Sequence, residues 1–357
     1  MSILSEVSWE EFREYTIDRK APLLKKDGRV YHVLAAQQFD RHELEALGAL
    51  ATRIRFIAKA REGMRFLEDQ LPHRGAMLYF TQPSTRTFLS FRSACQILGM
   101  RCGDVRDPAT SSEYKGESPE DSVRTFSSYF DLIIMRSPEA GLAERTAWVL
   151  SHSERPVPII NAGSGKDQHP TQALLDVYTL QRSFEKQGGI DGKCVVFVGD
   201  LARGRTVRSL ALLLSNYRDM RLVFVAPDAL QVSPDILTVL AEKGVTCEVD
   251  NDFKARIPGA DAIYMTRVQD EWDVDGESAK IDTSRYCFGG ADLELLKPDA
   301  VLMHPLPRRN EISTDVDPDP RAMYWRQMRN GMWIRAALIA AIFGRDTAIN
   351  EYDEPSS

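Results

Sequence analysis

Gly75-Ala-Met-Leu-Tyr-Phe80, followed by Thr81-Gln-Pro-Ser-Thr-Arg-Thr87, is the stretch of sequence that decides the fold. The apolar run predicts a buried strand, because a parallel sheet that is covered by helices has strands that are apolar on both faces. A polar turn comes next, and a helix is predicted from about residue 85 to residue 98. A strand, a polar turn and a helix in this order are typical of an α/β fold.

The same alternation continues along the chain in both directions. Apolar residues recur at helical spacing from Phe39 to Ile57, behind the cap candidate Asp40. The glycine-containing break at residues 187–192 separates two series, so we expect two α/β units with parallel sheets. Further strands are predicted at residues 131–135, 157–160, 194–198, 222–226, 262–265 and 301–303, and further helices at residues 170–184, 205–214, 234–243 and 322–343.

Length, composition and charge exclude several classes of protein. The chain has 357 residues, enough for roughly two domains. Hydrophobic residues make up 43% and charged residues 27%, which excludes a disordered or collagen-like chain. The net charge of -7 disfavours a nucleic-acid binder, which is usually basic.

The cysteines and the apolar segments predict the compartment. The five cysteines are an odd number and include no C-x-x-C pair, which indicates a reducing compartment. The N-terminal residues 1–12 carry acids where a secretory signal has an apolar run, and the longest strongly apolar stretch, residues 336–343, is too short to span a membrane. We therefore expect a soluble cytoplasmic protein that does not associate with a membrane.

Three polar segments follow predicted strands in the first half of the chain. Ser84-Thr-Arg-Thr87 brings hydroxyls, a guanidinium and backbone N–H groups to a helix N-terminus, which suits an anion, although a plain helix cap has the same residue types. Arg136 ends a buried strand, where a structural ion pair is the alternative. His169 opens a helix, so it is expected to be a neutral donor that can polarise a carbonyl, or else a capping or packing residue.

Three more polar segments follow strands in the second half. The turn Gly199–Arg205 lacks the G-x-G-x-x-G spacing, which disfavours a nucleotide-dependent dehydrogenase, and it places Arg205 where a carboxylate could bind. Arg267 and the segment His304-Pro-Leu-Pro-Arg308 also follow strands, and each has a rigid loop or a surface charge as its alternative. Several arginines with one histidine and no acid–base carboxylate pair suit polyanionic substrates. The sequence contains neither a metal-binding H-E-x-x-H motif nor a G-x-S-x-G nucleophile motif.

Taken together, these motifs resemble those of the aspartate/ornithine carbamoyltransferase family. The motifs S-T-R-T, M-R-S-P, H-P-T-Q and H-P-L-P-R occur in the order and spacing of that family, over about residues 31–344. H-P-L-P-R together with T-R-V-Q is similar to the aspartate branch, because the ornithine branch usually has a cysteine in H-C-L-P. The resemblance implies transfer of carbamoyl from carbamoyl phosphate to the amine of L-aspartate in pyrimidine biosynthesis, with no cofactor and no metal.

The resemblance also implies a domain organisation. It predicts an α/β fold of two doubly wound domains, each a parallel sheet flanked by helices, that are linked by two long inter-domain helices. Residues 31–172 and 325–357 are expected to bind carbamoyl phosphate, and residues 173–324 to bind the amino acid. Residues 1–30 are expected to form an N-terminal extension that mediates assembly or covers the fold.

Roles for individual residues follow from the resemblance alone. It implies catalytic roles for Arg86, Thr87, Arg136, His169 and Lys115. It implies that carbamoyl phosphate is held by Ser84, Thr85, Arg86, Thr87, Arg136, His169, Gln172, Pro305, Leu306, Ser111 and Lys115. It implies that L-aspartate is held by Arg205, Arg267 and Gln269.

An assembly is also implied, because in the family the residues that match Ser111 and Lys115 reach the site of a neighbouring subunit. We therefore expect a homotrimer with shared active sites. Whether regulatory chains or a dihydroorotase-like partner associate with it stays open.

The chain departs from the family pattern at five positions. The phosphate loop usually reads F-x-E-P-S-T-R-T-R-x-S-F-E, and here Gln82, Phe88 and Arg92 occupy three of its places. Trp272 replaces the arginine that ends R-V-Q-x-E-R, and Ala202 replaces a lysine after G-D-L. In the family, the acid and the arginine that match positions 82 and 272 pair in the closed state. Losing both avoids the cost of one unpaired charge.

These departures leave three alternatives for the activity. The protein is an aspartate carbamoyltransferase that closes differently, a carbamoyltransferase for another carboxylate-bearing amine, or a weak paralogue that serves as a scaffold. A binding module that senses carbamoyl phosphate or another phosphate anion is a separate alternative, against which His169, Gln172 and Lys115 argue.

Overall fold

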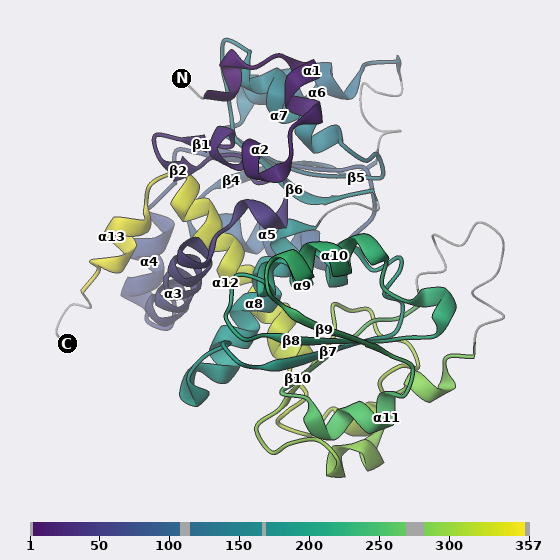
Figure 1. The fold of residues 1–357 in the computed structure, drawn as a ribbon. Coiled ribbons are helices and arrows are strands. Elements are labelled where there is room, and N and C mark those ends of the chain that lie inside the picture. The colour runs from purple at the N-terminus through teal and green to yellow at the C-terminus, as the bar shows by residue number, and fades with distance from the viewer. Residues whose placement is uncertain (1–2, 108–114, 166–168, 269–281, 354–357) are drawn as a thin grey trace. The chain divides into compact units, whose positions relative to one another are not determined.

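The computed structural model describes residues 3–107, 115–165, 169–268 and 282–353 (Figure 1). The chain divides into two compact units: residues 1–175 with 329–357, and residues 176–328. Two long helices, α8 (Pro170–Phe184) and α12 (Tyr324–Ile342), each contribute residues to both units. The predicted fold class, two α/β units with parallel sheets joined by two helices, is confirmed.

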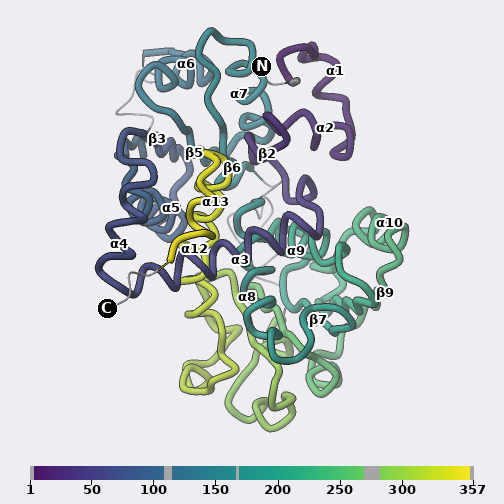
Figure 2. Tube along the Cα trace, turned by 90° about the vertical axis from the view of Figure 1, so that its left-hand side faces the viewer, coloured from purple at the N-terminus to yellow at the C-terminus, as the bar shows by residue number. Residues whose placement is uncertain are grey.

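The described part of the first unit contains a four-stranded parallel sheet in the order β4-β3-β5-β6. In chain order the strands are β3 (Gly75–Phe80), β4 (Arg101–Val105), β5 (Leu132–Ser137) and β6 (Ile159–Ser164). The helices are α3 (Arg41–Ile57), α4 (Arg61–Glu68), α5 (Thr85–Ile97), α6 (Pro119–Tyr129), α7 (Leu142–Ser151) and α13 (Asp346–Asn350). Helix α13 packs against α3, so both ends of the chain contribute to this unit (Figure 2).

The N-terminal segment shares the hydrophobic core of the first unit. It forms a 3₁₀ turn (Ile3–Glu6), helices α1 (Trp9–Glu14) and α2 (Ile17–Leu23), and a hairpin of β1 (Lys25–Lys26) and β2 (Arg29–Val30). Leu4, Phe12 and Leu24 are fully buried in that core. The Trp148 Nε1–H of α7 donates to the Val7 carbonyl at 2.8 Å. The extension therefore contributes apolar side chains to the core of this unit.

A backbone ladder joins the next segment to the sheet. The Val33 N–H donates to the Ile159 carbonyl and the Asn161 N–H to the Val33 carbonyl, both at 2.8 Å. His32 lies beside this ladder, and its Nδ1 accepts the Ile159 N–H at 3.1 Å. Nε2 therefore carries the proton, and it lies 3.0 Å from Ser151 Oγ. Burial lowers the pKa of His32 to about 3, so this imidazole is neutral.

The described part of the second unit contains a five-stranded parallel sheet in the order β11-β10-β7-β8-β9. The strands are β7 (Cys194–Val198), β8 (Arg221–Val225), β9 (Thr246–Asp250), β10 (Ala262–Met265) and β11 (Val301–Met303). The helices are α9 (Arg205–Leu214), α10 (Pro234–Glu242) and α11 (Phe253–Arg256). The core contains Val196, Val223 and Ile263 from the three interior strands.

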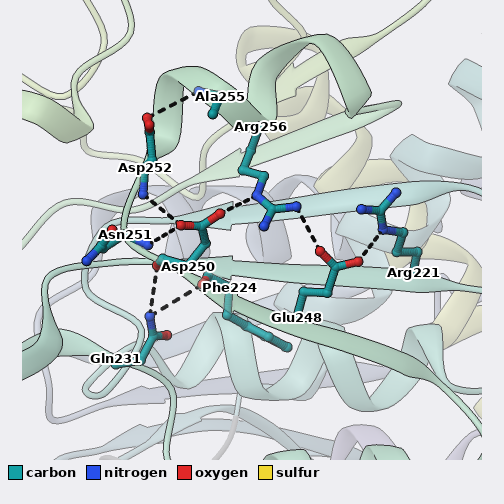
Figure 3. Close-up of polar contacts among 9 residues, drawn as sticks. All are labelled: Arg221, Phe224, Gln231, Glu248, Asp250, Asn251, Asp252, Ala255 and Arg256. Atoms are coloured by element: carbon teal, nitrogen blue, oxygen red, sulfur yellow. Dashed lines mark hydrogen bonds and ion pairs between the residues drawn. The ribbon is translucent and has the colours of Figure 1, made fainter.

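A ladder of charged side chains covers the β8–β9 edge of this sheet (Figure 3). Glu248 accepts from Arg221 Nε and from Arg256 Nη1, each at 2.7 Å, and Arg256 also pairs with Asp250. The Gln231 amide donates to the carbonyls of Phe224 and Asp250, which ties the ends of β8 and β9 together. Charge on an edge strand discourages pairing with another chain.

The structure differs from the sequence prediction at one edge of each sheet, where β4 and β9 lie. Strands β4 and β9 were not predicted, because their residues are partly exposed and polar rather than continuously apolar. The third predicted strand, residues 157–160, is displaced to β6, which ends in the polar residues of Asn161-Ala-Gly-Ser164. Helices α4, α6 and α7 lie in stretches to which no helix was assigned.

Candidate active site

The strand order of the first unit locates its ligand-binding edge. The chain leaves β3 toward β4 on one side and returns to β5 on the other, so β3 and β5 flank a topological switch point. Ligands of open α/β sheets bind beyond the carboxyl ends of such strands. The Gln82 N–H and the Thr81 hydroxyl both donate to the Arg136 carbonyl, at 3.2 and 3.3 Å. The loop after β3 is thereby held against the end of β5.

Ser84–Thr87 lies at the N-terminus of α5, as predicted. Ser84 is the N-cap residue, and within the described residues its side chain forms no cap hydrogen bond with the helix. The plain-cap alternative is therefore not supported. Thr87 is buried, whereas Thr85 and Arg86 are exposed. The first-turn N–H groups, the helix dipole and the Arg86 guanidinium make this end of α5 suited to a phosphate group.

Arg136 and His169 reach the same edge of the sheet from β5 and from the segment after β6. Arg136 is buried and its Nη1 donates to the Ala162 carbonyl at 3.1 Å. The Gly165 N–H donates to the Ser137 carbonyl at 3.0 Å, which joins the end of β6 to the end of β5. His169 precedes α8, and its carbonyl accepts the Gln172 N–H at 3.0 Å. The imidazole and the Gln172 amide are both buried at the start of that helix.

Arg335, from α12, was not predicted, and it contacts both α5 and α8. Its side chain is buried, and it donates to the Ser90 hydroxyl of α5 at 2.6 Å and to the Thr171 hydroxyl of α8 at 3.4 Å. Its guanidinium also lies over the Phe91 ring at 4.7 Å. A lone arginine within the apolar run of residues 333–340 was the available signal, since a buried arginine needs partners.

Of the two residues that were predicted to reach a neighbouring subunit, the structure describes only Lys115. Lys115 is exposed just before α6. Ser111 lies outside the described residues.

The second unit has its own switch point, between β7 and β10. Gly199 follows β7 with a φ of +113°, and a Cβ added there would lie 2.1 Å from the Thr266 carbonyl oxygen. Only glycine therefore permits the two strand ends to approach this closely. The Thr266 N–H donates to the Val198 carbonyl at 2.8 Å, and its hydroxyl lies 3.1 Å from the same oxygen.

The residues that were predicted to bind L-aspartate come after these strands. Arg205 begins α9 and Arg267 follows Thr266, and both are partly buried. Arg267 Nη1 donates to the Val268 carbonyl at 2.9 Å. Gln269 lies outside the described residues, as does Trp272.

The segment His304–Arg308 follows β11 and is held at both of its ends. The Leu306 N–H donates to His304 Nδ1 at 2.7 Å, and His304 Nε2 lies 2.7 Å from Glu311 Oε1. Arg308 pairs with Asp317, where its Nη2 lies 2.6 Å from Oδ2. Pro305 and Leu306 are partly buried between these anchors.

Burial and charge set the protonation of the His304–Glu311 pair. Burial lowers the pKa of His304. The neighbouring Glu311 favours the imidazolium and so raises this pKa, but the effect of burial is larger. Arg267 and Arg308 are near enough to lower that pKa further. Burial tends to raise the pKa of Glu311, but hydrogen bonds from His304 and from the Arg309 N–H lower it overall. The pair is thus a neutral imidazole beside a carboxylate.

The departures from the family motif have a structural account in part. Phe88 is buried against Phe80 at a ring distance of 5.5 Å, and the Arg106 guanidinium lies 4.5 Å from the Phe88 ring centroid. A phenylalanine at position 88 thus keeps a cation beside the phosphate loop. Ala202 is exposed.

Two negative findings apply to the part of the chain that the structure describes. No group of three or more His, Cys, Asp or Glu side chains there could hold a metal ion. No helix there is long and apolar enough to cross a membrane.

Comparisons with known proteins agree with this geometry. Residues 31–182 match the family described as "Aspartate/ornithine carbamoyltransferase, carbamoyl-P binding domain", and residues 191–342 match its "Asp/Orn binding domain". The chain is 43% identical to "Aspartate carbamoyltransferase 1, chloroplastic" of Pisum sativum, over 87% of this chain and 78% of that protein. It is 41% identical to the aspartate carbamoyltransferase catalytic subunit of Vibrio cholerae, over 87% and 96%.

Solved structures give the same result. Aspartate transcarbamoylase from Trypanosoma cruzi in complex with carbamoyl aspartate and phosphate has a TM-score of 0.77 and 36% identity, and covers 87% of this chain and 95% of its own. The catalytic subunit of M. jannaschii aspartate transcarbamoylase has a TM-score of 0.77 and 34% identity, and covers 88% and 98%. The two matched domains span most of the sequence, so the chain belongs to the aspartate/ornithine carbamoyltransferase family.

Proposed function

We propose that the protein transfers the carbamoyl group of carbamoyl phosphate to the amine of L-aspartate, which yields N-carbamoyl-L-aspartate and phosphate for pyrimidine biosynthesis. The observation that carries this proposal is that the family motifs follow the carboxyl ends of strands in both sheets. The Trypanosoma cruzi relative, whose structure holds carbamoyl aspartate and phosphate, supports the choice of substrates.

The first unit supplies the groups for carbamoyl phosphate. Ser84, Thr85, Arg86 and Thr87 hold the phosphate at the N-terminus of α5, where the dipole and the guanidinium favour negative charge. Thr87, Arg136 and His169 polarise the carbamoyl oxygen, and the imidazole of His169 acts as a donor. Gln172 and the backbone of Pro305 and Leu306 bind the carbamoyl NH2 group.

The reaction needs no side-chain nucleophile. The amine nitrogen attacks the carbamoyl carbon, and the charge that develops on the carbamoyl oxygen is stabilised by donors that are already in place. The bond from carbon to the phosphate oxygen then breaks. Phosphate leaves with the electron pair and accepts the proton of the amine. Most of the rate enhancement comes from positioning and electrostatic stabilisation.

The second unit supplies the groups for L-aspartate. Arg205, at the start of α9, and Arg267, just after β10, bind its two carboxylates together with Gln269. An arginine can donate two parallel hydrogen bonds to a carboxylate, which gives both affinity and orientation. Because Gln82 and Trp272 replace a charged pair of the family, specificity for the acceptor amine is the part of this proposal that most needs a test.

The assembly is a homotrimer with shared sites, in which Ser111 and Lys115 serve a neighbouring subunit. The exposure of Lys115 supports this part of the proposal, because the side chain can reach another chain. Regulatory chains or a dihydroorotase-like protein are further partners that the same assembly could take.

The compartment is a reducing one, and we assign it to the cytoplasm. The five cysteines are all free thiols, which supports this assignment. The pea relative is named chloroplastic, so the chloroplast is the alternative compartment. Fractionation of the native source separates the two compartments.

The deciding experiment measures phosphate release and carbamoyl product from carbamoyl phosphate with L-aspartate and with a panel of other amino acids. Saturable turnover with L-aspartate is expected. Turnover only with another carboxylate-bearing amine would show that this amine, and not L-aspartate, is the acceptor substrate. A protein that binds carbamoyl phosphate without turnover with any acceptor would instead be a sensor or a scaffold.

A further inference from the structure

We propose that Glu311 is a positioning residue, which acts through His304 to fix the backbone of Pro305 and Leu306 and thereby selects a carbamoyl group over an acyl group of the same shape. This inference rests on the proposed function, in which that backbone binds the carbamoyl NH2 group. It adds a residue that the family motif H-P-L-P-R does not include.

The segment between His304 and Arg308 has a single backbone donor. Pro305 and Pro307 have no N–H, so the only donor is the Leu306 N–H. It donates to His304 Nδ1 at 2.7 Å. Leu306 also has a φ of +57°, a conformation that residues other than glycine rarely adopt and that surrounding contacts must hold. The acceptor on His304 therefore controls how the two carbonyls of this segment are oriented.

The tautomer of His304 follows from this contact. A backbone N–H can only donate, so Nδ1 is the acceptor and the proton is on Nε2. Nε2–H then donates to Glu311 Oε1 at 2.7 Å. The same carboxylate oxygen accepts the Arg309 N–H at 3.0 Å, beyond the far end of the segment. Glu311 thus holds the imidazole ring and the following backbone at once.

Other contacts anchor the base of the segment. The His304 N–H donates to Gln327 Oε1 at 2.9 Å, and Gln327 Nε2 donates to Asp176 Oδ1 at 2.6 Å. Asp176 Oδ2 accepts the Tyr264 hydroxyl at 2.8 Å. These residues are buried, so the polar side chains that hold the main chain of His304 are themselves rigid. The remaining freedom belongs to the imidazole and to Leu306, which Glu311 restricts.

A specificity follows from this arrangement. Carbonyl oxygens accept hydrogen bonds from the NH2 group of carbamoyl phosphate, and they gain nothing from the methyl group of acetyl phosphate. A site that binds a substrate NH through buried polar groups rejects the analogue that lacks it. If the segment loses its orientation, binding of the carbamoyl compound weakens and binding of the acetyl compound does not.

The experiment compares kcat/KM for carbamoyl phosphate with kcat/KM for acetyl phosphate, with L-aspartate as acceptor. His304→Leu removes the acceptor for the Leu306 N–H, and Glu311→Leu removes the acceptor for Nε2–H. Each is expected to lower the ratio about tenfold, the effect of one lost hydrogen bond. His304→Asn restores an acceptor near Nδ1 and Glu311→Gln one near Oε1, so both should recover much of the ratio. Glu294→Gln, in the same unit, is the matched control.

Two results would overturn the proposal. One is an equal loss for both acyl phosphates in the leucine variants, which indicates a general structural defect. The other is a leucine variant that keeps the wild-type ratio. Circular dichroism melting of each variant shows whether it folds.

A pH profile keeps the proposal testable if the leucine variants do not fold. An imidazolium has a proton on Nδ1 and cannot accept from Leu306, so the wild-type ratio should fall toward acid pH. His304 faces Glu311, Arg267 and Arg308, and of these only the carboxylate favours the imidazolium. Glu311→Gln should therefore move the fall to lower pH. A profile that does not move contradicts the proposed coupling.

Binding of two stable analogues separates this inference from the proposed function. Phosphonoacetamide has the NH2 group and acetonylphosphonate has a methyl group in its place, and calorimetry measures both without turnover. A wild-type protein that prefers the amide but does not carbamoylate L-aspartate contradicts the proposed activity alone, and the variants are then compared by binding. A wild-type protein that carbamoylates L-aspartate but binds both analogues equally overturns this inference and leaves the proposed activity standing.

Discussion

Arg136 is the residue on which the proposed carbamoyl phosphate site depends most directly. Its guanidinium lies at the carboxyl end of β5, and its carbonyl receives the loop that leads to α5. In the proposed mechanism Arg136→Gln removes a donor to the developing oxyanion, so we expect kcat/KM for carbamoyl phosphate to fall by about 10²–10³. Initial-rate assays measure this loss. Arg124→Gln, on an exposed face of α6, is the control and should retain activity.

The depressed pKa of His32 makes stability depend on pH. Its pKa is about 3 in the folded protein, against about 6.5 in an unfolded chain. Between these values the unfolded state binds the extra proton, so the free energy of unfolding falls as the pH falls, by at most about 1.4 kcal/mol per pH unit. Urea unfolding at several pH values measures the slope.

Two variants test this assignment. In His32→Gln the slope should largely disappear between about pH 6 and pH 4. His73→Gln, on the surface, should keep the wild-type slope. An unchanged slope in His32→Gln would mean that other groups dominate acid unfolding.

At the residue scale, sequence motifs predicted which side chains occur at the strand ends but not what supports them. Arg86, Thr87, Arg136 and His169 were identified because each lies in a motif immediately after a strand. Their supports come from distant parts of the chain, as Arg335 does for Ser90 of α5. A single sequence contains no signal that brings residues 245 positions apart into contact.

At the scale of elements, apolar strands were predictable and polar edge strands were not. The edge strand β11 was predicted at residues 301–303 and the edge strand β6 in part, because both contain apolar residues. Strands β3, β5, β7, β8 and β10 are continuous apolar runs, because helices cover both of their faces. Strands β4 and β9 lie at the edges and contain polar, partly exposed residues, so they lack both apolar runs and clear alternation. Their pairing depends on neighbours that are already in place, which local sequence does not report.

Helix α12 contacts α5 and α8 through Arg335, and an effect of this contact on the proposed site can be tested. Arg335→Met keeps the length of the side chain but removes the donors to Ser90 and Thr171. We expect unfolding to become easier by about 1–3 kcal/mol and the KM for carbamoyl phosphate to rise, because α5 and α8 lose a common partner. Thermal melting and steady-state kinetics measure the two effects.

The control for this prediction is Arg326→Met, an exposed position on the same helix. It should change neither quantity. A loss of stability in Arg335→Met without any change in KM would separate α12 from substrate binding.

At the scale of the whole molecule, shared sites predict complementation between inactive variants. If Lys115 serves a neighbouring subunit, a Lys115→Ala chain and an Arg136→Gln chain are each nearly inactive alone. Mixed trimers then contain sites with an intact Arg136 and an intact Lys115 from different chains. Random 1:1 mixing should restore about a quarter of the sites.

Co-expression with two different affinity tags yields the mixed assemblies for this assay. Activity that stays at the parental level would show that each site uses residues of one chain. Light scattering on the unmixed protein reports the number of subunits independently.

The division of the chain into units has a consequence for the order in which a ribosome completes them. The second unit is one continuous stretch, residues 176–328, whereas the first unit also requires residues 329–357. Synthesis of such a chain takes on the order of tens of seconds, and domains fold as they emerge. The half that begins first is therefore finished last. Arg335, which contacts α5 and α8, is synthesised late. A nascent chain therefore contains the S-T-R-T and H-P-T-Q motifs before it contains the residue that holds their two helices.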